Sequence, residues 1–193
     1  PAVWAGDGGS RLVVATEDGL LLRSEDRGDS WSGEPASLSA LSLAWDHGGN
    51  LYAGTEDQGV YRWAAEGAPL RLDGPETDPV ASPIVALSWT GGRLYAATPG
   101  TLFYTDAGAD GRTATNWVRS QAVADGIRSL AITDQGIVYV GTAISGVIRS
   151  NDAGQIWTPA WEGLGLAAGQ MVAVNTLLVD PLEPGVLYAA VDH

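Results

Sequence analysis

The sequence predicts an all-β protein built from repeated four-stranded antiparallel sheets, and two observations lead to this expectation. Short runs rich in β-branched and aromatic residues alternate with Gly, Asn and Asp, and no stretch has a sustained helical period. One string also recurs, as LVVAT at residue 12, LYAGT at 51, LYAAT at 94, VYVGT at 138 and LYAAV at 187. The copies start 39 to 49 residues apart, a period that fits one four-stranded sheet per repeat.

A second motif occurs twice with the same spacing. SEDRGDSW and SNDAGQIW both read Ser-x-Asp-x-Gly-x-x-Trp, and each follows a Gly, two or three apolar residues and an Arg. Asp and Ser side chains bond nearby backbone amides in tight turns, and Gly accepts a backbone angle that other residues resist. The Trp is then an apolar anchor for the next strand. The predicted turn residues are Ser24, Asp26, Gly28, Trp31, Ser150, Asp152, Gly154 and Trp157.

A degenerate third copy lies between these two. The segment TDAGADGRTATNW carries Asp106, Gly108 and a displaced Trp117. The three copies resemble the Asp box, or bacterial neuraminidase repeat, whose family consists of β-propellers. The resemblance extends to sialidases, to xyloglucanase-type glycoside hydrolases and to propeller assembly factors. It implies a β-propeller of four-stranded antiparallel blades with Asp-box turns.

The repeats divide the chain into about four and a half blades. We expect residues 1–193 to form a single β-propeller region, with blades at approximately 1–36, 37–80, 81–123 and 124–169 and a partial blade at 170–193. In the second repeat the expected strands are 41–45, 51–55, 59–63 and a fourth near 70–72. Both ends supply inner strands, so we expect a fragment of a larger ring of six to eight blades. An open five-bladed arrangement is the alternative.

The charge balance restricts the partners. Ten basic residues, all Arg, face 23 acidic ones, for a net charge of −13. Such a surface repels phosphate backbones, so we expect no nucleic-acid partner. No apolar run is long enough to cross a bilayer as a helix, and there is no Cys.

We expect no cofactor and no metal. His47 and His193 have no second His or Cys at ligand spacing, so the sequence supports no metal site there. The loop 106–111 offers fewer oxygen ligands than a Ca²⁺ site requires.

The candidate ligand-binding residues lie in the loops that join second to third strands. TEDG at 16–19 and TEDQG at 55–59 place four carboxylates on adjacent blades, from Glu17, Asp18, Glu56 and Asp57. Paired carboxylates can serve as acid and base on a glycoside or bind a cation. LYAGTEDQGVYRW is similar to the segment around one catalytic Asp of xyloglucanase-type hydrolases, and the resemblance puts Glu56 at that position. Solvated acidic turns are the simpler interpretation of the same residues.

A sialidase would need other residues. The resemblance implies an Arg-Ile-Pro segment and an Arg triad, but Arg23, Arg62 and Arg149 share one repeat position beside the turn motif. Arg at this position is typical of packing against a neighbouring blade or an aromatic ring. Trp45 and Trp89 also repeat at equivalent positions, which indicates packing between blades. Trp4, Trp63 and Trp161 do not, and could contact sugar rings or a protein partner.

The sequence therefore predicts a non-catalytic propeller that binds or scaffolds other proteins in an extracellular or cell-surface setting, with a protein partner or self-assembly and, as a further possibility, carbohydrate. The alternative is a glycoside hydrolase that acts on a neutral polysaccharide. A sialidase is the least favoured of the three functions.

Overall fold

The computed structural model describes residues 2–6, 10–16, 18–35, 38–63, 69–72, 82–106, 117–162, 172–180, 182–183 and 185–192. Every regular element among these residues is a β-strand, and the strands form antiparallel sheets in chain order. The predicted all-β class with four-stranded sheets is thus confirmed. In the same residues no helix is long and apolar enough to span a membrane.

Four sheets have four strands each and a fifth has two. The first sheet contains β1 (Ala2–Gly6), β2 (Arg11–Ala15), β3 (Leu20–Ser24) and β4 (Ser32–Pro35). The second contains β5 (Ala40–Trp45), β6 (Leu51–Thr55), β7 (Val60–Trp63) and β8 (Leu70–Arg71). The third contains β9 (Ala86–Thr90), β10 (Arg93–Ala97), β11 (Thr101–Asp106) and β12 (Val118–Ala122).

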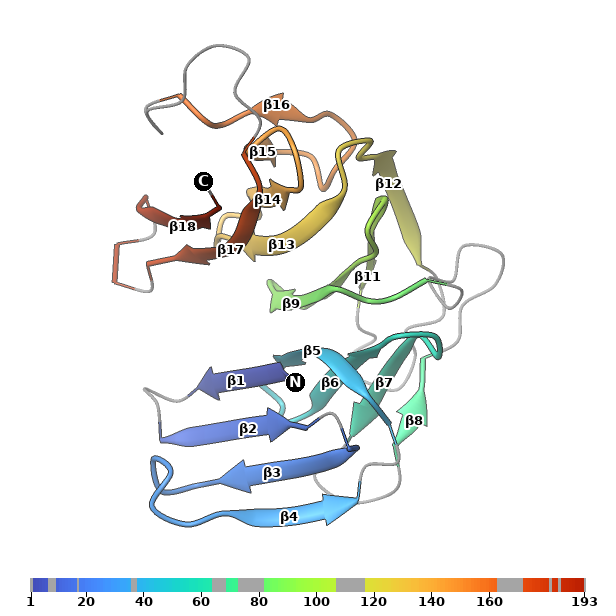
Figure 1. Ribbon diagram of the computed structural model, residues 1–193, viewed down its shortest axis with the longest axis vertical. Helices are drawn as coiled ribbons and strands as arrows, with labels where there is room; N and C mark the ends of the chain where they lie inside the picture. Colours follow the sequence, from blue (N-terminus) through green and yellow to red (C-terminus); the bar gives the residue numbers. More distant parts are fainter. Residues whose placement is uncertain are drawn as a thin grey trace.

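The fourth sheet contains β13 (Ile127–Ile132), β14 (Val138–Thr142), β15 (Val147–Ser150) and β16 (Thr158–Pro159), and the fifth contains β17 (Val174–Val179) and β18 (Leu187–Val191). The sheets follow one another around an arc (Figure 1). The first strands β1, β5, β9, β13 and β17 lie innermost, and each contacts the next. This is the arrangement of propeller blades.

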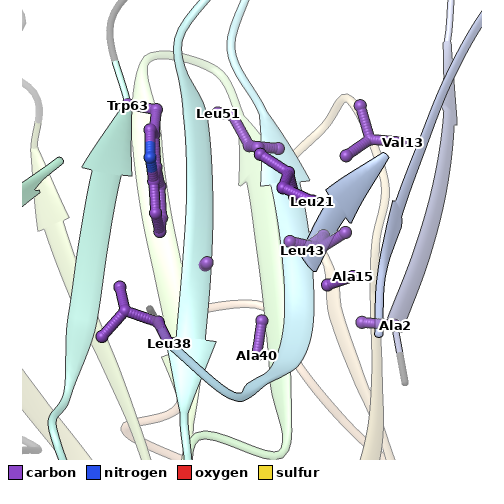
Figure 2. Packing of buried hydrophobic residues seen from close by; sticks show 10 residues of the cluster. Ala2, Val13, Ala15, Leu21, Leu38, Ala40, Leu43, Leu51 and Trp63 are labelled. Carbon is purple, nitrogen blue, oxygen red and sulfur yellow. The ribbon is translucent and has the colours of Figure 1, made fainter. Parts of the chain in front are cut away.

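Apolar side chains fill the space between consecutive sheets. The core between the first and second sheets includes Val13, Leu21, Leu43, Leu51 and Trp63, all of them buried (Figure 2). Equivalent clusters lie between the second and third, the third and fourth, and the fourth and fifth sheets. The sheets therefore bury apolar side chains on the faces that meet one another.

Trp45 and Trp89 have the expected packing role. The Trp89 ring stacks on Tyr52 of the preceding sheet, with ring centroids 5.4 Å apart, and Arg11 lies 5.3 Å from the centroid of Trp45. Trp63 is buried, whereas Trp161 is about one-third exposed. The side chain of Trp4 lies outside the described residues.

Candidate functional site

The turns between second and third strands share one design. In each, the Thr at the end of the second strand donates its hydroxyl hydrogen to the carbonyl that closes the turn. The donor and acceptor pairs are Thr16 with Leu20, Thr55 with Gly59, Thr98 with Thr101 and Thr142 with Gly146, at 2.8 to 3.3 Å. The same Thr hydroxyl accepts a hydrogen bond from a backbone amide of the turn in every case. These are ordered turns rather than open loops.

The segments that lead from one sheet to the next cross these turns. The amide of Ile84 donates to Thr55 O (2.9 Å), that of Ile127 to Pro99 O (2.6 Å) and that of Gly146 to Val172 O (3.0 Å). Turns and connections thus form one surface, which we call the turn face. It comprises residues 16, 18–20, 55–59, 98–101 and 142–146 with the adjoining connections 123–126 and 172–173.

The turn face carries exposed carboxylates. Asp18, Glu56 and Asp57 are exposed on the first two sheets, and the one hydroxyl hydrogen of Thr16 is shared between the Asp18 carboxylate and the Leu20 carbonyl. Glu17 lies outside the described residues. In the described part of the chain no three His, Cys, Asp or Glu residues are grouped as a metal site would require. Three of the four predicted carboxylates therefore lie on this face.

Two further charged residues reach the turn face from segments that the sequence interpretation passed over. Asp125, in the connection between β12 and β13, accepts a hydrogen bond from the hydroxyl of Ser145. Arg128 donates to Asn175 Oδ1 (2.6 Å) and lies 3.9 Å from Asp192 Oδ2. The Ala-Asp-Gly that precedes an inner strand was the available signal for Asp125.

β-Bulges explain why Arg128 and Asn175 are exposed on buried inner strands. The register shifts between Ala40 and Ser42, between Ile127 and Ser129, and between Val174 and Thr176. The extra residue in each is Leu41, Arg128 or Asn175, and all three are exposed. A bulge turns a side chain away from the alternating pattern of its strand. The inner strands therefore also contribute exposed side chains near the turn face.

The Ser-x-Asp-x-Gly-x-x-Trp segments form the turns between third and fourth strands, at the opposite end of the sheets. Ser24 Oγ donates to Asp26 Oδ1 (2.8 Å) and accepts from the Gly28 amide (2.8 Å). Ser150 makes the same two bonds, to Asp152 at 2.6 Å and from Gly154 at 2.8 Å. We call these the Ser–Asp turns.

The carboxylates of the Ser–Asp turns are occupied by the turn itself. Asp26 Oδ1 also accepts from the Ser30 amide (2.8 Å), and Asp152 Oδ1 accepts from the Ile156 amide (2.9 Å). The hydrogen bond from the Ser30 hydroxyl is the main cause that lowers the pKa of Asp26 from 3.8 to about 2. The Ser150 hydroxyl is likewise the main cause that lowers the pKa of Asp152.

The degenerate third copy has a different arrangement. Asp106 pairs with Arg93 (2.6 Å), as Glu25 pairs with Arg11 (3.0 Å) in the first sheet. Asp106 thus makes the contact of Glu25 and not that of Asp26. Trp117 is buried in the core between the second and third sheets, and Gly108 lies outside the described residues.

Comparison with known proteins assigns the fold. No family model and no curated protein matches the sequence. A structure of YCF48 bound to a D1 peptide is similar over 95% of this chain and 58% of its own, at 18% identity and a TM-score of 0.65. The WD40 β-propeller domain of Doa1 matches over 97% of this chain and 60% of its own, at 16% identity and a TM-score of 0.68.

The extracellular domain of BT4673 of B. thetaiotaomicron, described as a one component system, matches over 93% of this chain and 24% of its own, at 15% identity and a TM-score of 0.68. This chain therefore spans less than two thirds of each of these three structures. Together with the arc of four-stranded sheets, the comparisons show that the chain has the β-propeller fold.

Proposed function

We propose that this protein is a non-catalytic β-propeller that acts as a binding or scaffolding module for other proteins. The observation that carries the proposal is the turn face. Ordered, Thr-anchored turns of the first two sheets present Asp18, Glu56 and Asp57 to solvent from a preformed backbone. Asp125, in the connection before β13, adds a half-buried carboxylate beside Ser145 of the fourth-sheet turn. A rigid surface loses little conformational entropy on binding, which favours recognition of a large partner.

The charge of the chain indicates the partner chemistry. With 23 acidic and 10 basic residues, the surface attracts a partner whose docking face carries Arg or Lys. Peptide binding by YCF48, a similar fold, supports a protein partner. An extracellular or cell-surface setting is supported by the extracellular domain among the similar structures.

We also propose that the chain belongs to the Asp-box propellers. The identical hydrogen bonds of the two Ser–Asp turns support this assignment. The proposed blades are approximately residues 1–36, 37–80, 81–123 and 124–169, with a partial blade at 170–193, in a single region.

A glycoside hydrolase is the second candidate, because Glu56 is exposed on the turn face as that function would require. The hypothesis that the protein is a sialidase has less support. Arg23, Arg62 and Arg149 lie on the third strands of three separate sheets, each opposite a second-strand residue, and do not gather on the turn face. An arginine triad for a substrate carboxylate needs three side chains at one point.

Two measurements test the proposal. A photo-crosslinking residue placed at position 57 should capture a protein partner in the native extract, whereas the same residue at the exposed position Asp134, on a turn between first and second strands, should not. Equal capture from both positions would show that the partner does not bind specifically at the turn face. Release of reducing sugar from xyloglucan or β-glucan, abolished by Glu56→Gln, would show that the protein is an enzyme and refute the scaffold.

A further inference from the structure

Two Asp-Gly pairs of the turn face lie in turns of the same form. They are Asp18–Gly19 and Asp125–Gly126. In each, the glycine amide donates to the carbonyl three residues earlier, at 3.2 Å in the first pair and 3.4 Å in the second. The glycine φ is 80° in the first pair and 75° in the second. The two aspartates therefore have the same local backbone setting. The other Asp-Gly pairs begin at residues 7, 73 and 110, outside the described residues.

An Asp-Gly pair has a specific reactivity, because glycine has no side chain to shield its amide nitrogen from the carboxyl group before it. The nitrogen forms a bond to Asp Cγ and loses its proton, and one carboxyl oxygen leaves as water. Water then opens the resulting succinimide at either carbonyl, which yields aspartate or isoaspartate. The sequence of steps needs no oxidant and neither adds nor removes atoms overall. In isoaspartate the main chain runs through Cβ and Cγ and is therefore longer by a CH2 group.

The reaction requires the peptide to leave its native geometry. The glycine amide must give up its turn hydrogen bond, and Cγ must approach the nitrogen to bonding distance. Contacts that hold the carbonyls or the carboxylate oppose this rotation, and they slow the reaction by the free energy of the local opening that releases them. Tertiary contacts therefore decide the relative rates of two turns that share one local form.

The fourth sheet holds the second pair at both carbonyls and at the carboxylate. The Ala143 amide shares its hydrogen between Asp125 O (3.1 Å) and Gly126 O (2.9 Å). The Ser145 hydroxyl donates to the Asp125 carboxylate, and Asp125 is half-buried. Ala143 and Ser145 both belong to the turn that follows β14. Opening of the second pair therefore breaks hydrogen bonds between its connection and another turn.

The first pair has only local hydrogen bonds. Among the described residues Asp18 and Gly19 are hydrogen-bonded to Thr16 alone, through the Thr16 hydroxyl on the Asp18 carboxylate and through the Gly19 amide on Thr16 O. Asp18 is exposed. Because these bonds lie inside one turn, opening of the pair breaks no hydrogen bond to a second sheet.

The exposure of Asp18 belongs to its position at the tip of the turn. The second and fourth sheets have a described sheet on both sides, and their turns are also exposed at the tip, at Glu56, Asp57, Ile144 and Ser145. Segments with few buried contacts open at the lowest free energy in a folded protein. Turn tips of this face therefore combine solvent access with ready local opening.

We propose that Asp18 is a site of spontaneous isomerisation to isoaspartate, whereas the contacts with the fourth-sheet turn protect Asp125 from the same reaction. The product carries a free α-carboxylate on a lengthened main chain. This is the group that isoaspartyl carboxyl methyltransferases methylate, with S-adenosylmethionine as the methyl donor.

Isomerisation changes the shape of the turn face and keeps its charge. The negative charge at residue 18 is retained, but the longer main chain no longer fits the hydrogen bonds between Thr16 and Leu20. The reaction needs water alone and no partner. Its outcome is therefore independent of the proposed scaffold function.

Peptide mapping of the aged, folded protein tests the proposal. The chain has no Lys, and trypsin cleavage after Arg places Asp18 in the peptide 12–23 and Asp125 in the peptide 120–128, each with a single Asp-Gly pair. During incubation at neutral pH and body temperature, isoaspartate should accumulate in 12–23 at least about tenfold faster than in 120–128. Isoaspartyl methyltransferase and tritiated S-adenosylmethionine label the product, and the label in each peptide gives its rate.

Two variants and an unfolded control separate tertiary protection from local sequence. Ser145→Ala, at an exposed position, removes the hydrogen bond to the Asp125 carboxylate, so 120–128 should react faster while 12–23 is unchanged as the internal reference. Asp18→Glu should abolish the label in 12–23, because the larger ring that Glu would have to close forms far more slowly. In urea the two peptides of the wild type should react at similar rates.

Two results would overturn the proposal. One is an equal or faster reaction in 120–128 than in 12–23 of a protein whose circular dichroism shows it to be folded. The other is label that appears in 12–23 only after unfolding, because the native turn would then protect Asp18 as well.

Discussion

Serine and aspartate make different hydrogen bonds in the Ser–Asp turns. Ser24 and Ser150 are buried and join the carboxylate to the backbone amide of the Gly four residues later. Asp26 lies at the exposed surface, where it gathers hydrogen bonds from Ser24 and Ser30. The turn is thus held by short-range bonds that the local sequence supplies in full, which explains why eight residues suffice to specify it.

The low pKa of Asp26 predicts an acid-dependent loss of stability. Because the folded pKa is about 2 and the ordinary value is 3.8, the stabilisation is present above about pH 4 and is lost as the pH falls toward 2. The Tm of the wild type should therefore fall more steeply between pH 4 and pH 2 than the Tm of Asp26→Asn. Asp152→Asn should act in the same direction, and a double variant should combine both effects. Identical pH profiles for all four proteins would contradict this role.

The residue before the turn glycine is strained. Arg27 and Ala153 occupy equivalent positions and have φ values of 65° and 58°, in the left-handed region that favours glycine. Arg27 is exposed, so Arg27→Gly removes the strain without opening a cavity. We expect a gain of up to about 1 kcal/mol in the free energy of unfolding in urea. Arg119→Gly, on the exposed strand β12, should instead destabilise by about 0.5–1 kcal/mol.

At the scale of elements, a Ser–Asp turn also fastens one sheet to the next. The Gln121 amide on β12 donates to Gly154 O (2.8 Å), and Trp157 Nε1 donates to Gln121 O (3.4 Å). The first sheet has no preceding sheet among the described residues, and Trp31 there is 45% exposed. The motif of the fourth sheet therefore stabilises an interface as well as a turn.

Glycine substitution should separate these two roles. A Cβ at Gly154 would lie 2.6 Å from Ser120 Cβ, whereas a Cβ at Gly28 would meet nothing closer than 3.5 Å, and both residues have positive φ. Gly28→Ala should therefore cost about 1–2 kcal/mol through backbone strain. Gly154→Ala should cost about 1–3 kcal/mol more, because the third and fourth sheets must move apart. Urea unfolding of both variants measures the difference, and equal losses would rule out the interface role.

At the scale of the molecule, stability is shared among serial interfaces. Each core cluster joins only adjacent sheets, as in repeat proteins. Leu21 is buried between the first and second sheets and Leu102 between the third and fourth. Loss of packing at one interface should therefore destabilise chiefly the two sheets that meet there.

Leu21→Ala tests this expectation. The lost contacts should lower the free energy of unfolding by about 2–5 kcal/mol and speed hydrogen exchange chiefly in the first and second sheets, β1–β8. Leu102→Ala should speed exchange on both sides of its interface, in the third and fourth sheets. Uniform acceleration over all sheets in the Leu21 variant would indicate a single cooperative unit instead.

Net charge acts on the whole molecule. At −13 the chain repels itself, and the few exposed ion pairs, such as Arg11 with Glu25, contribute little. Screening should therefore stabilise the fold, and the Tm should rise as NaCl increases from about 0.01 to about 0.15 M, where the Debye length falls from about 30 to about 8 Å. A Tm that falls with salt would mean that ion pairs outweigh the repulsion.

The sequence alone determined the features that depend on near neighbours. Strand runs, their period and the Ser–Asp turns follow from alternation, glycine and bonds within four residues, so the all-β class and the repeat could be predicted. Glu56 and Asp57 could be placed on a turn for the same reason. The role of Asp106 could not be predicted, because its pairing with Arg93 is set by the register of β10 and β11 and not by the spacing of the motif.

Only the tertiary structure decided which repeated positions are covered. Tyr52 and Tyr139 occur in the same string, yet Tyr52 is buried under Trp89 of the next sheet, whereas Tyr139 is half-buried. Asp125 meets Ser145 through the connection that leads into the fourth sheet, and Arg128 meets Asn175 because the inner strands β13 and β17 lie side by side. Burial and charge pairing across sheets depend on which blade stands next to which. The local sequence pattern is the same in every repeat, so it cannot specify which blades are neighbours.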